Sequence, residues 1–443
     1  MLPHIPFPAL PVPPSWFPGH MLQFSRMLPT VLAKTDVVLE LRDSRLPLTS
    51  INRNFEGSLQ KWRKDRGRIS LSDPSLDPAM SASLPPSPPS KNPLVCERVV
   101  VFNKRDLVPE WGIEPFQKAM ATKFPDQTVF FASWNRQRDI KALNDLLVSM
   151  SRISAGPSLI LTIIHAEIAK DHPYQPELNV LVVGMPNVGK STLLNALRSI
   201  GIAGPTPKAL RTSANPGMTR VLSTRLKLSV DPLVYAFDSP GVMLPFLGKG
   251  DRGAERGVKL ALIAGIKEGL YDIEALASYL LYRLNVLDPV SPAYLRILPP
   301  DTPPLLDVDD FLTALATRLC MLKKGGIPDH ARASVWFINW WREEGGFLSA
   351  SAPALLSGTQ THRRGWGFDL EWSVDAAEAG RYDPALIQSK MEECIEAFEA
   401  AAIEEEKEGG GVSSTQEKKR VREELLAKRA ARTRAKLVRM GRG

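Results

Sequence analysis

The amino-acid sequence predicts an α/β fold, in which a doubly wound, mostly parallel sheet is followed by an α-helical domain and a basic tail. Up to about residue 265, short β-branched runs alternate with segments of helical periodicity, which is typical of strand–helix–strand units. Beyond that point the pattern changes to helical periodicity. From Lys418 onward the chain carries eleven Lys or Arg against two Glu.

Five apolar runs predict the strands of the sheet. Each is short, rich in Val, Leu or Phe, and bounded by polar or turn-forming residues. The fourth is followed by a loop and then by a predicted helix, Lys190–Ile200. The five runs are Thr35–Asp43, Glu97–Asp106, Gln127–Ser133, Glu177–Gly184 and Pro232–Gly241.

The same patterns divide the chain into four parts. Residues 1–15 form a Pro-rich extension, 16–265 the α/β domain, 266–405 the helical domain and 406–443 a linker with the basic tail. Within the α/β domain, residues 71–92 are rich in Ser and Pro, which predicts a disordered insertion because such a segment buries too little apolar surface to order itself. The predicted helices of the second domain are Asp272–Asn285, Asp307–Lys324 and Ala331–Gly346.

Composition excludes some classes of protein. No apolar run reaches the roughly 18 residues of a membrane span, so we expect no transmembrane segment. The three cysteines are far apart and form neither a disulfide framework nor a metal-ligand spacing, which fits a reducing compartment. The N-terminal extension lacks Arg and acidic residues, so it is only a weak match to an Arg-rich transit peptide.

The charge is concentrated at one end of the chain. The net charge is +8, and the segment from Lys418 to Gly443 alone carries about +9, so the rest of the chain is close to −1. This asymmetry favours a polyanionic partner such as nucleic acid. The alternative is a solvated tail that contributes only to solubility.

A phosphate-binding loop is indicated by Gly184–Ser191, GMPNVGKS, which fits the pattern G-x-x-x-x-G-K-[ST]. A strand precedes it and a helix follows, so a helix N-terminus would face the anion. We expect Lys190 to contact the β- and γ-phosphates and Ser191 to bind Mg²⁺. The predicted nucleotide contacts of this loop are Asn187, Val188, Gly189, Lys190, Ser191 and Thr192.

A second motif, Asp238–Gly241 (DSPG), follows the fifth strand about fifty residues later. Asp238 is predicted to hold Mg²⁺ through water, and the Gly241 N–H to contact the γ-phosphate. Between the two motifs, Thr219 in NPGMTR is the candidate for the second hydroxyl on Mg²⁺. The predicted metal site is thus Ser191, Thr219 and Asp238, with Thr219 and Gly241 acting at the γ-phosphate.

The base-reading motif is Asn103–Asp106, NKRD. The Asp106 carboxylate can accept hydrogen bonds from guanine N1–H and N2–H₂, a donor pair that adenine lacks. We expect Lys104 to lie over the base plane, Asn103 to brace the phosphate loop, and Ser133 to begin a second base-contacting loop. The alternative for NKRD alone is an exposed turn at the end of a strand.

These motifs occur in the order base reader, phosphate loop, switch threonine and D-x-x-G. In an ordinary GTPase the base reader comes last. A doubly wound sheet binds its ligand at the carboxyl ends of its strands, and these ends keep their places if the termini are joined and new ones are cut. The sequence therefore predicts a circularly permuted GTPase domain.

The permuted order, with Trp16–Met21 (WFPGHM) and Leu41–Asn52 (LRDSRLPLTSIN), resembles the circularly permuted ribosome-assembly GTPases, most closely their mitochondrial ribosome-associated type. The resemblance covers Trp16 to Phe347. It implies hydrolysis of GTP to GDP with Mg²⁺, coupled to maturation of the large ribosomal subunit through rRNA and ribosomal proteins. One departure is Ser133-Trp134, where the family often has Ser-Ala.

The resemblance also bears on location and assembly state. It favours a monomer in the mitochondrial matrix, with peripheral association with the inner membrane as an option. Nucleolar and cytosolic relatives share the permuted order, so these compartments stay open.

Two residues bear on the mechanism of hydrolysis. Many GTPases place a Gln after D-x-x-G to orient water, and here that position is Val242, so intrinsic hydrolysis should be slow. His20, in the resembling WFPGHM segment, is the candidate water-positioning group, with a structural histidine as the alternative. Resemblance to related GTPases makes Asn187 a candidate ligand of K⁺, against a plain turn residue.

Two other functions compete with a ribosome-assembly switch. A metabolic kinase would need an acceptor site and would not need NKRD or a switch threonine. A module that binds GTP and RNA with little hydrolysis would be consistent with Val242.

Overall fold

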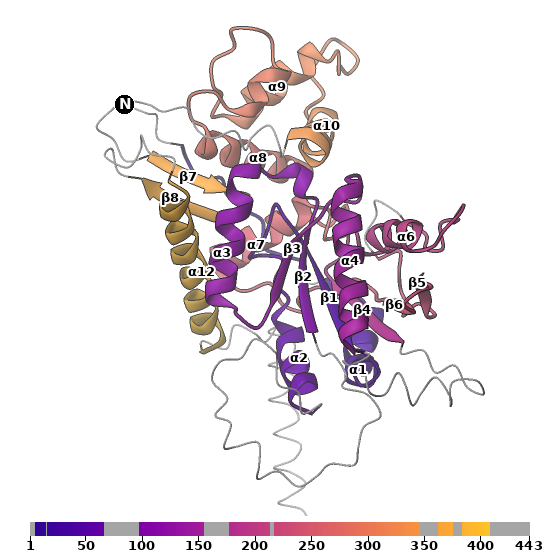
Figure 1. The fold of residues 1–443 in the computed structure, drawn as a ribbon. Helices are drawn as coiled ribbons and strands as arrows, with labels where there is room; N and C mark the ends of the chain where they lie inside the picture. The colour runs from indigo at the N-terminus through magenta and orange to yellow at the C-terminus, as the bar shows by residue number, and fades with distance from the viewer. Residues whose placement is uncertain are drawn as a thin grey trace, which may run out of the picture.

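The computed structural model describes most of the chain, and Figure 1 shows a central sheet with helices packed around it. The Ser/Pro-rich segment 71–92 and the basic tail from Lys418 lie outside the described residues, so the expectations for them stay predictions. The described residues are 5–14, 16–65, 97–154, 177–212, 217–345, 362–374 and 383–407.

Six strands form the main sheet in the order β3-β2-β1-β4-β6-β5. All neighbours run parallel except β5, which pairs antiparallel with β6. This confirms the predicted doubly wound, mostly parallel sheet, while β5, a short and half-polar strand, was not predicted. The strands are β1 (Val37–Asp43), β2 (Glu97–Asn103), β3 (Thr128–Phe131), β4 (Leu178–Gly184), β5 (Leu226–Ser229) and β6 (Val234–Asp238).

The strand order shows how the permuted chain is wound. From β1 the chain steps outward through β2 to β3, and then returns to the other side of β1, where β4 pairs with it. The winding direction reverses between β1 and β4, which is the point where doubly wound sheets bind their ligands. The base-reading motif follows β2 and the phosphate loop follows β4, so both lie at the carboxyl edge of the sheet beside this point.

The sheet is buried on both faces, as parallel sheets are. In β2, Val99 and Val101 belong to the main core, whereas Val100 and Phe102 face a second core that contains α3. The helices of the α/β part are α1 (Gly19–Leu32), α2 (Arg53–Asp65), α3 (Ile113–Lys123), α4 (Gln137–Ser154), α6 (Lys190–Gly201) and α7 (Gly250–Leu262).

Three helices predicted beyond residue 265 are present, α8 (Ile273–Leu287), α9 (Val308–Arg318) and α10 (His330–Trp340). Each begins after an aspartate, and these residues accept hydrogen bonds from backbone N–H groups of the first turn. Within the described residues, no helix combines the length and the apolar character needed to cross a membrane.

The part expected to be a helical domain also contains strands. β7 (His362–Trp366) and β8 (Leu370–Val374) form a hairpin, and together with α12 (Pro384–Lys407) they pack back onto the α/β part beside α3, as Figure 1 shows. Trp366 explains this placement, because its ring stacks on Phe116 at 5.1 Å and its Nε1 donates to the Pro109 carbonyl at 3.1 Å. The prediction of a helical domain over 266–405 is therefore wrong in one respect, because this part of the chain also contains the β7–β8 hairpin.

Candidate nucleotide-binding site

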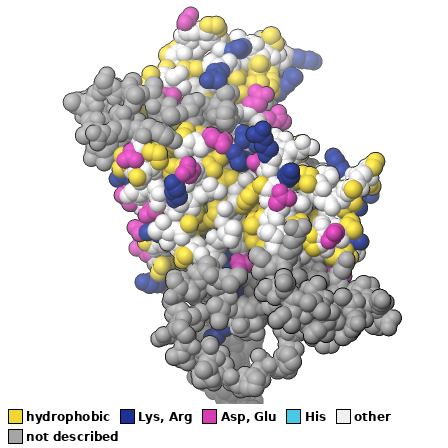
Figure 2. All heavy atoms as spheres, in the orientation of Figure 1, with side chains coloured by type: hydrophobic (Ala, Val, Ile, Leu, Met, Phe, Trp, Pro, Cys, Tyr) yellow, Lys and Arg dark blue, Asp and Glu magenta, His cyan; other side chains and the backbone are white. Residues whose placement is uncertain are grey.

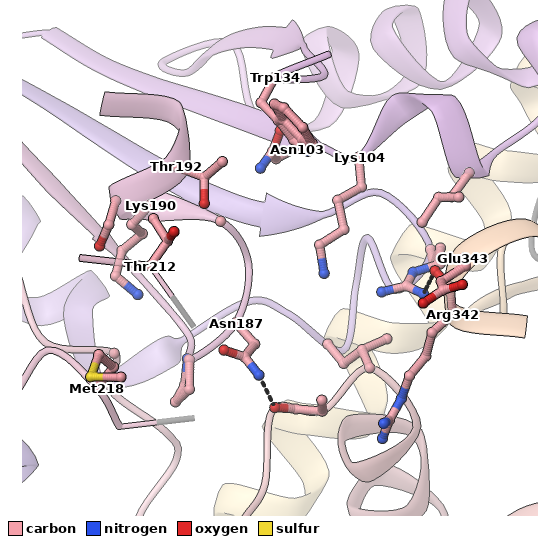
Figure 3. Close-up of a pocket in the computed structure, with 18 of the residues that line it drawn as sticks. Asn103, Lys104, Trp134, Asn187, Lys190, Thr192, Thr212, Met218, Arg342 and Glu343 are labelled. Carbon is pink, nitrogen blue, oxygen red and sulfur yellow. Dashed lines mark hydrogen bonds between the residues drawn. The ribbon is translucent and has the colours of Figure 1, made fainter. Parts of the chain in front are cut away.

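A pocket of about 750 Å³ lies at the carboxyl edge of the sheet. Figure 3 shows Lys190 and Lys104 on its two sides, with Arg342 and Glu343 beyond Lys104. Its wall comes from the phosphate loop, the segment after β2 and also the region after α7. Among the lining residues are Arg45, Asn103, Lys104, Asp106, Trp134, Asn135, Asn187, Gly189, Lys190, Ser191, Thr192, Thr219, Gly241, Ala264, Glu268, Asn339, Arg342 and Glu343.

The phosphate loop and the base-reading motif touch directly. Asn103 donates from Nδ2 to the Val188 carbonyl at 2.7 Å, which is the bracing contact expected of Asn103. Gly189 has a φ of +91°, and a Cβ there would lie 2.4 Å from the Asn103 amide nitrogen. The side chain of Val188 is fully buried, so only its backbone faces this region.

Lys190 is the buried cation of the phosphate end. Its Nζ donates to the carbonyls of Gly184 at 3.2 Å and Met185 at 2.8 Å. Burial lowers the pKa of Lys190 to about 8, partly offset by Asp238. The phosphates of a nucleotide would supply the full counter-charge that this ammonium lacks.

The predicted metal ligands Ser191 and Asp238 lie together. Ser191 Oγ donates to Asp238 Oδ2 at 2.5 Å, and burial raises the pKa of Asp238. Asp238 Oδ1 is buried and has no hydrogen-bond partner among the described residues, so it is free for a hydrated cation. This oxygen donor set fits Mg²⁺, which would neutralise phosphate charge when bound.

Thr219 and Gly241 line the same pocket. A Cβ on Gly241 would lie 2.6 Å from Pro186 Cα, so the DSPG loop packs directly against the phosphate loop. The contact of the Gly241 N–H with the γ-phosphate stays a prediction.

At the base end, the Asp106 carboxylate is held by its neighbours. Ser133 Oγ donates to Asp106 Oδ1, and Asn135 Nδ2 donates to Oδ2 at 3.3 Å. Ser133 is fully buried and is not among the pocket-lining residues, so it orients Asp106 from behind. Trp134, in contrast, is 56 % exposed and lines the pocket.

Lys104 has an anchor that the sequence analysis missed. Its Nζ contacts Asp43 Oδ2 at 2.9 Å, and Asp43 also pairs with Arg45. Asp43 and Arg45 both lie in the segment LRDSR, which the sequence analysis named only as part of the resemblance to the GTPase family. The available signal was the position of Asp43 at the end of a strand next to β2.

Comparison with known proteins agrees with this geometry. Residues 179–282 match the family model described as 50S ribosome-binding GTPase. Over 352 residues the chain is 30 % identical to Mitochondrial GTPase 1 of Schizosaccharomyces japonicus, which spans 79 % of this chain and 93 % of that protein. The chain belongs to the mitochondrial GTPase 1 family.

The chain is also similar to a protein of Xenopus tropicalis and to a solved structure. It is 29 % identical over 273 residues to Mitochondrial ribosome-associated GTPase 1 of Xenopus tropicalis, covering 61 % of this chain and 70 % of that protein. Among solved structures, GNP-bound YlqF from T. maritima matches with a TM-score of 0.40 and 16 % identity, over 74 % of this chain and 96 % of that one. The resemblance found in the sequence is confirmed, and the protein is a guanine-nucleotide-binding GTPase.

In this mitochondrial GTPase 1 homologue, Val242 is fully buried. Its N–H donates to the Gly184 carbonyl at 3.2 Å, and its carbonyl accepts from Asn52 Nδ2 at 2.9 Å. The residue after DSPG is therefore part of the core and presents no polar side chain to a water molecule. The group that orients water must come from elsewhere.

His20 lies beside the segment that carries Thr219. A Cβ on Gly217 would be 3.9 Å from His20 Cε1. His20 Nε2 is buried with no hydrogen-bond partner among the described residues, and burial, with a smaller contribution from Arg220, lowers the pKa of His20. His20 is not among the residues that line the pocket, so a role in catalysis would require this segment to move.

Substitution of Asp106 by Asn should switch the base preference of this mitochondrial GTPase 1 homologue. The change places a donor where guanine also donates, so GTP affinity should fall by roughly 10⁴ while xanthosine triphosphate, which offers an acceptor there, binds comparatively better. Titration of both nucleotides against the wild type and Asp106→Asn measures this, with Asp126→Asn as an exposed control. Unchanged GTP affinity in Asp106→Asn would mean that the motif is only a turn.

Proposed function

We propose that this GTPase is a switch in the assembly of the large ribosomal subunit of mitochondria, acting as a monomer in the matrix or at the inner membrane surface. It would contact rRNA and ribosomal proteins. The observation that carries this proposal is the composition of the nucleotide pocket. Its wall includes Ala264 and Arg342, which lie after α7 and α10, and this supports transmission of a change at the nucleotide to the part of the chain beyond the GTPase motifs.

The contact surface fits a polyanionic partner. On the face shown in Figure 2, a group of Lys and Arg side chains lies where the helical part meets the sheet part, with Asp and Glu side chains beside it. Basic residues such as Lys104, Arg211 and Arg342 also line the pocket, so rRNA bound there would influence the position of the helical wall. The names of the relatives support a ribosomal partner, since the Xenopus tropicalis protein is called ribosome-associated.

Single-turnover hydrolysis of GTP, with and without large ribosomal subunits, tests this function. Because Val242 offers no water-orienting group, hydrolysis should be slow alone, and a subunit that completes the site should raise the rate by about 10²–10⁴-fold, as a positioned acid or base does. Lys190→Ala is the control, since it should remain folded and be inactive in both conditions. An equal rate with and without subunits would favour a GTP-holding module, and turnover only with a metabolite acceptor would favour a kinase.

We also propose that K⁺ assists hydrolysis beside Asn187. Asn187 has a left-handed φ of 58°, and its Nδ2 donates to the Ala264 carbonyl at 2.9 Å, as Figure 3 shows. A preorganised positive charge there would stabilise the transition state. Hydrolysis should therefore be faster in K⁺ than in Na⁺, and Asn187→Ala should remove the difference. Equal rates in both salts for the wild type would exclude this role.

The basic tail is proposed to bind rRNA phosphates. Between Lys418 and Gly443 there is no aromatic residue to stack on bases, so the contacts should be electrostatic and nearly independent of sequence. Deleting this segment should weaken binding to the subunit and flatten the dependence of log affinity on log salt concentration, while GTP affinity stays constant. If the truncated protein keeps the same salt slope, the tail is a solvated appendage and the RNA contacts lie elsewhere.

A further inference from the structure

Asp43 lies beside the base-reading motif because of the register of the sheet. It is the last residue of β1 and pairs with Asn103, the last residue of β2, so Lys104 follows immediately. Its side chain is fully buried. A buried carboxylate is costly unless its oxygens are paired and hydrogen-bonded, and here each oxygen has partners.

The carboxylate of Asp43 binds two cations, Arg45 through both oxygens and Lys104 through Oδ2. Oδ2 contacts Lys104 Nζ at 2.9 Å and Arg45 Nη2 at 2.9 Å. Oδ1 accepts from Arg45 Nε at 2.9 Å and from the Arg45 backbone N–H at 3.0 Å. The pKa of Asp43 is held far below its usual range because the attraction of Arg45 and Lys104 outweighs desolvation. These partners therefore favour the charged form of Asp43.

Lys104 depends on this partner for its position. Its backbone is in the left-handed region with a φ of 61°, which a residue with a Cβ adopts only when its surroundings enforce it. Burial lowers the pKa of Lys104, and Asp43 is the main opposing influence. Without Asp43, the half-buried ammonium would lose its ion-pair partner while Arg45 stays nearby.

Arg45 carries the connection further, into the part of the chain after α10. Its guanidinium lies 4.9 Å from the ring centroid of Trp341, and its Nη1 donates to the Arg342 carbonyl at 3.4 Å. Trp341 is almost completely buried and stacks on Phe368 at 4.8 Å. Arg45, the partner of Asp43, is thus also held by residues outside the GTPase motifs.

We propose that Asp43 is a positioning residue for guanine-nucleotide affinity. It holds the Lys104 side chain in the base end of the pocket, and the position of Lys104 depends in turn on the contacts of Asp43 with Arg45 and of Arg45 with Trp341. Asp43 acts through Lys104 and does not touch the nucleotide. A shift of the Trp341 segment would loosen Lys104 and release GDP faster. The inference concerns nucleotide binding by the isolated protein, so it stands or fails independently of any ribosomal partner.

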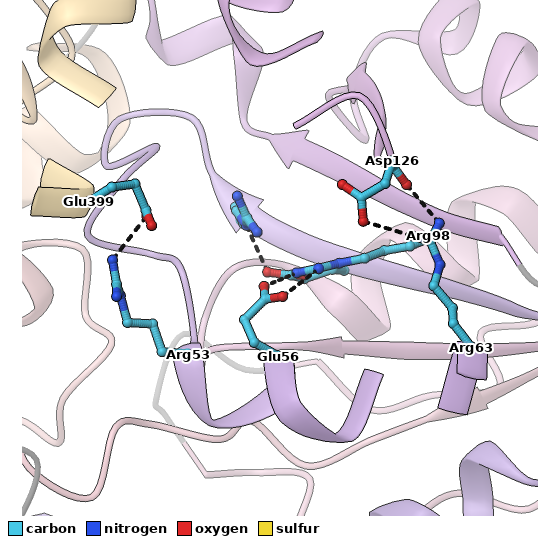
Figure 4. Close-up of polar contacts among 8 residues, drawn as sticks. Arg53, Glu56, Arg63, Arg98, Asp126 and Glu399 are labelled. Carbon is cyan, nitrogen blue, oxygen red and sulfur yellow. Dashed lines mark hydrogen bonds and ion pairs between the residues drawn. The ribbon is translucent and has the colours of Figure 1, made fainter. Parts of the chain in front are cut away.

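The strand also offers a matched control. Glu40 lies on β1 three residues before Asp43, is likewise buried, and pairs with Arg42 at 2.7 Å and with Arg98 at 2.5 Å. Figure 4 shows Arg98 extending from this pair to Glu56 of α2. None of these residues lines the pocket. Glu40→Gln therefore removes a comparable buried charge from the same strand without touching Lys104.

The test is the dissociation rate of GDP from the purified full-length protein, measured with a fluorescent GDP analogue. Asp43→Asn should raise this rate about tenfold, which corresponds to about 1.4 kcal/mol. In a Lys104→Met background the same substitution should have almost no further effect, because the group that Asp43 positions is gone. Glu40→Gln should lower the melting temperature and leave the dissociation rate unchanged.

Two outcomes would overturn the proposal. Equal acceleration by Asp43→Asn in the wild-type and Lys104→Met backgrounds would show that Asp43 does not act through Lys104. Acceleration by Glu40→Gln to the same extent would show a general effect of lost stability. If Asp43→Asn does not fold, Arg45→Lys decides when it is compared in the wild-type and Lys104→Met backgrounds, because it keeps a cation on Asp43 but removes the planar group beside Trp341, and a direct effect of Arg45 on the nucleotide would persist without Lys104. It should accelerate GDP release by about threefold, and a wild-type rate would contradict the proposal.

Discussion

The nucleotide site depends on the parallel pairing of β1 with β4. Leu41 of β1 pairs with Gly184 of β4, and on the other side Asp43 pairs with Asn103 of β2. A Cβ on Gly184 would lie 2.3 Å from the Leu41 carbonyl oxygen, so only glycine lets the phosphate loop leave the sheet this close to β1. Together, the pairings of β1 with β4 and with β2 bring three segments that are far apart in the sequence to the same edge.

The permuted order has a further consequence for the segment after β6. Gly241 packs on Pro186 of the phosphate loop, and the chain then runs through α7 to the helical wall of the pocket. Arg342 donates to the carbonyls of Leu262 at 2.8 Å and Ala261 at 3.1 Å at the C-terminal end of α7, and the Ala261 carbonyl also accepts from the Ala264 N–H at 2.9 Å. The helical wall is therefore tied to α7, the next helix in the sequence after the DSPG loop.

Sequence patterns predicted the features that depend on local chemistry. The strands before the phosphate loop and NKRD are buried Val-rich runs, and the strand before DSPG is a short apolar run. The helices α8, α9 and α10 have aspartate caps, so periodicity and capping were sufficient to predict these elements. β5 was missed because Leu226–Ser229 is short and half polar. The β7–β8 hairpin was missed because the packing of Trp366 on Phe116 is a contact between distant segments, and no local pattern encodes it.

The same distinction applies within the site. The role of Asn103 follows from its motif, whereas the roles of Ser133 and Asp43 depend on which residues lie behind the pocket. Ser133 holds Asp106 from a buried position, and Asp43 becomes a partner of Lys104 only through the β1–β2 register. A residue that acts through another side chain leaves no signal in its own spacing, and its function appears only when the strands are paired.

The polar groups of the pocket are unevenly satisfied, and this gives the nucleotide a structural role. Lys190 is buried with a lowered pKa, Asp238 is buried with a raised pKa, and Asp238 Oδ1 and Asn103 Oδ1 have no hydrogen-bond partner among the described residues. Each of these unpaired polar groups costs free energy that phosphate, a cation or the base would recover on binding.

Ligands that bind only the folded state stabilise it by mass action. Because Arg342 and Ala264 line the same pocket, a bound nucleotide would also lie against the helical wall beyond the GTPase motifs.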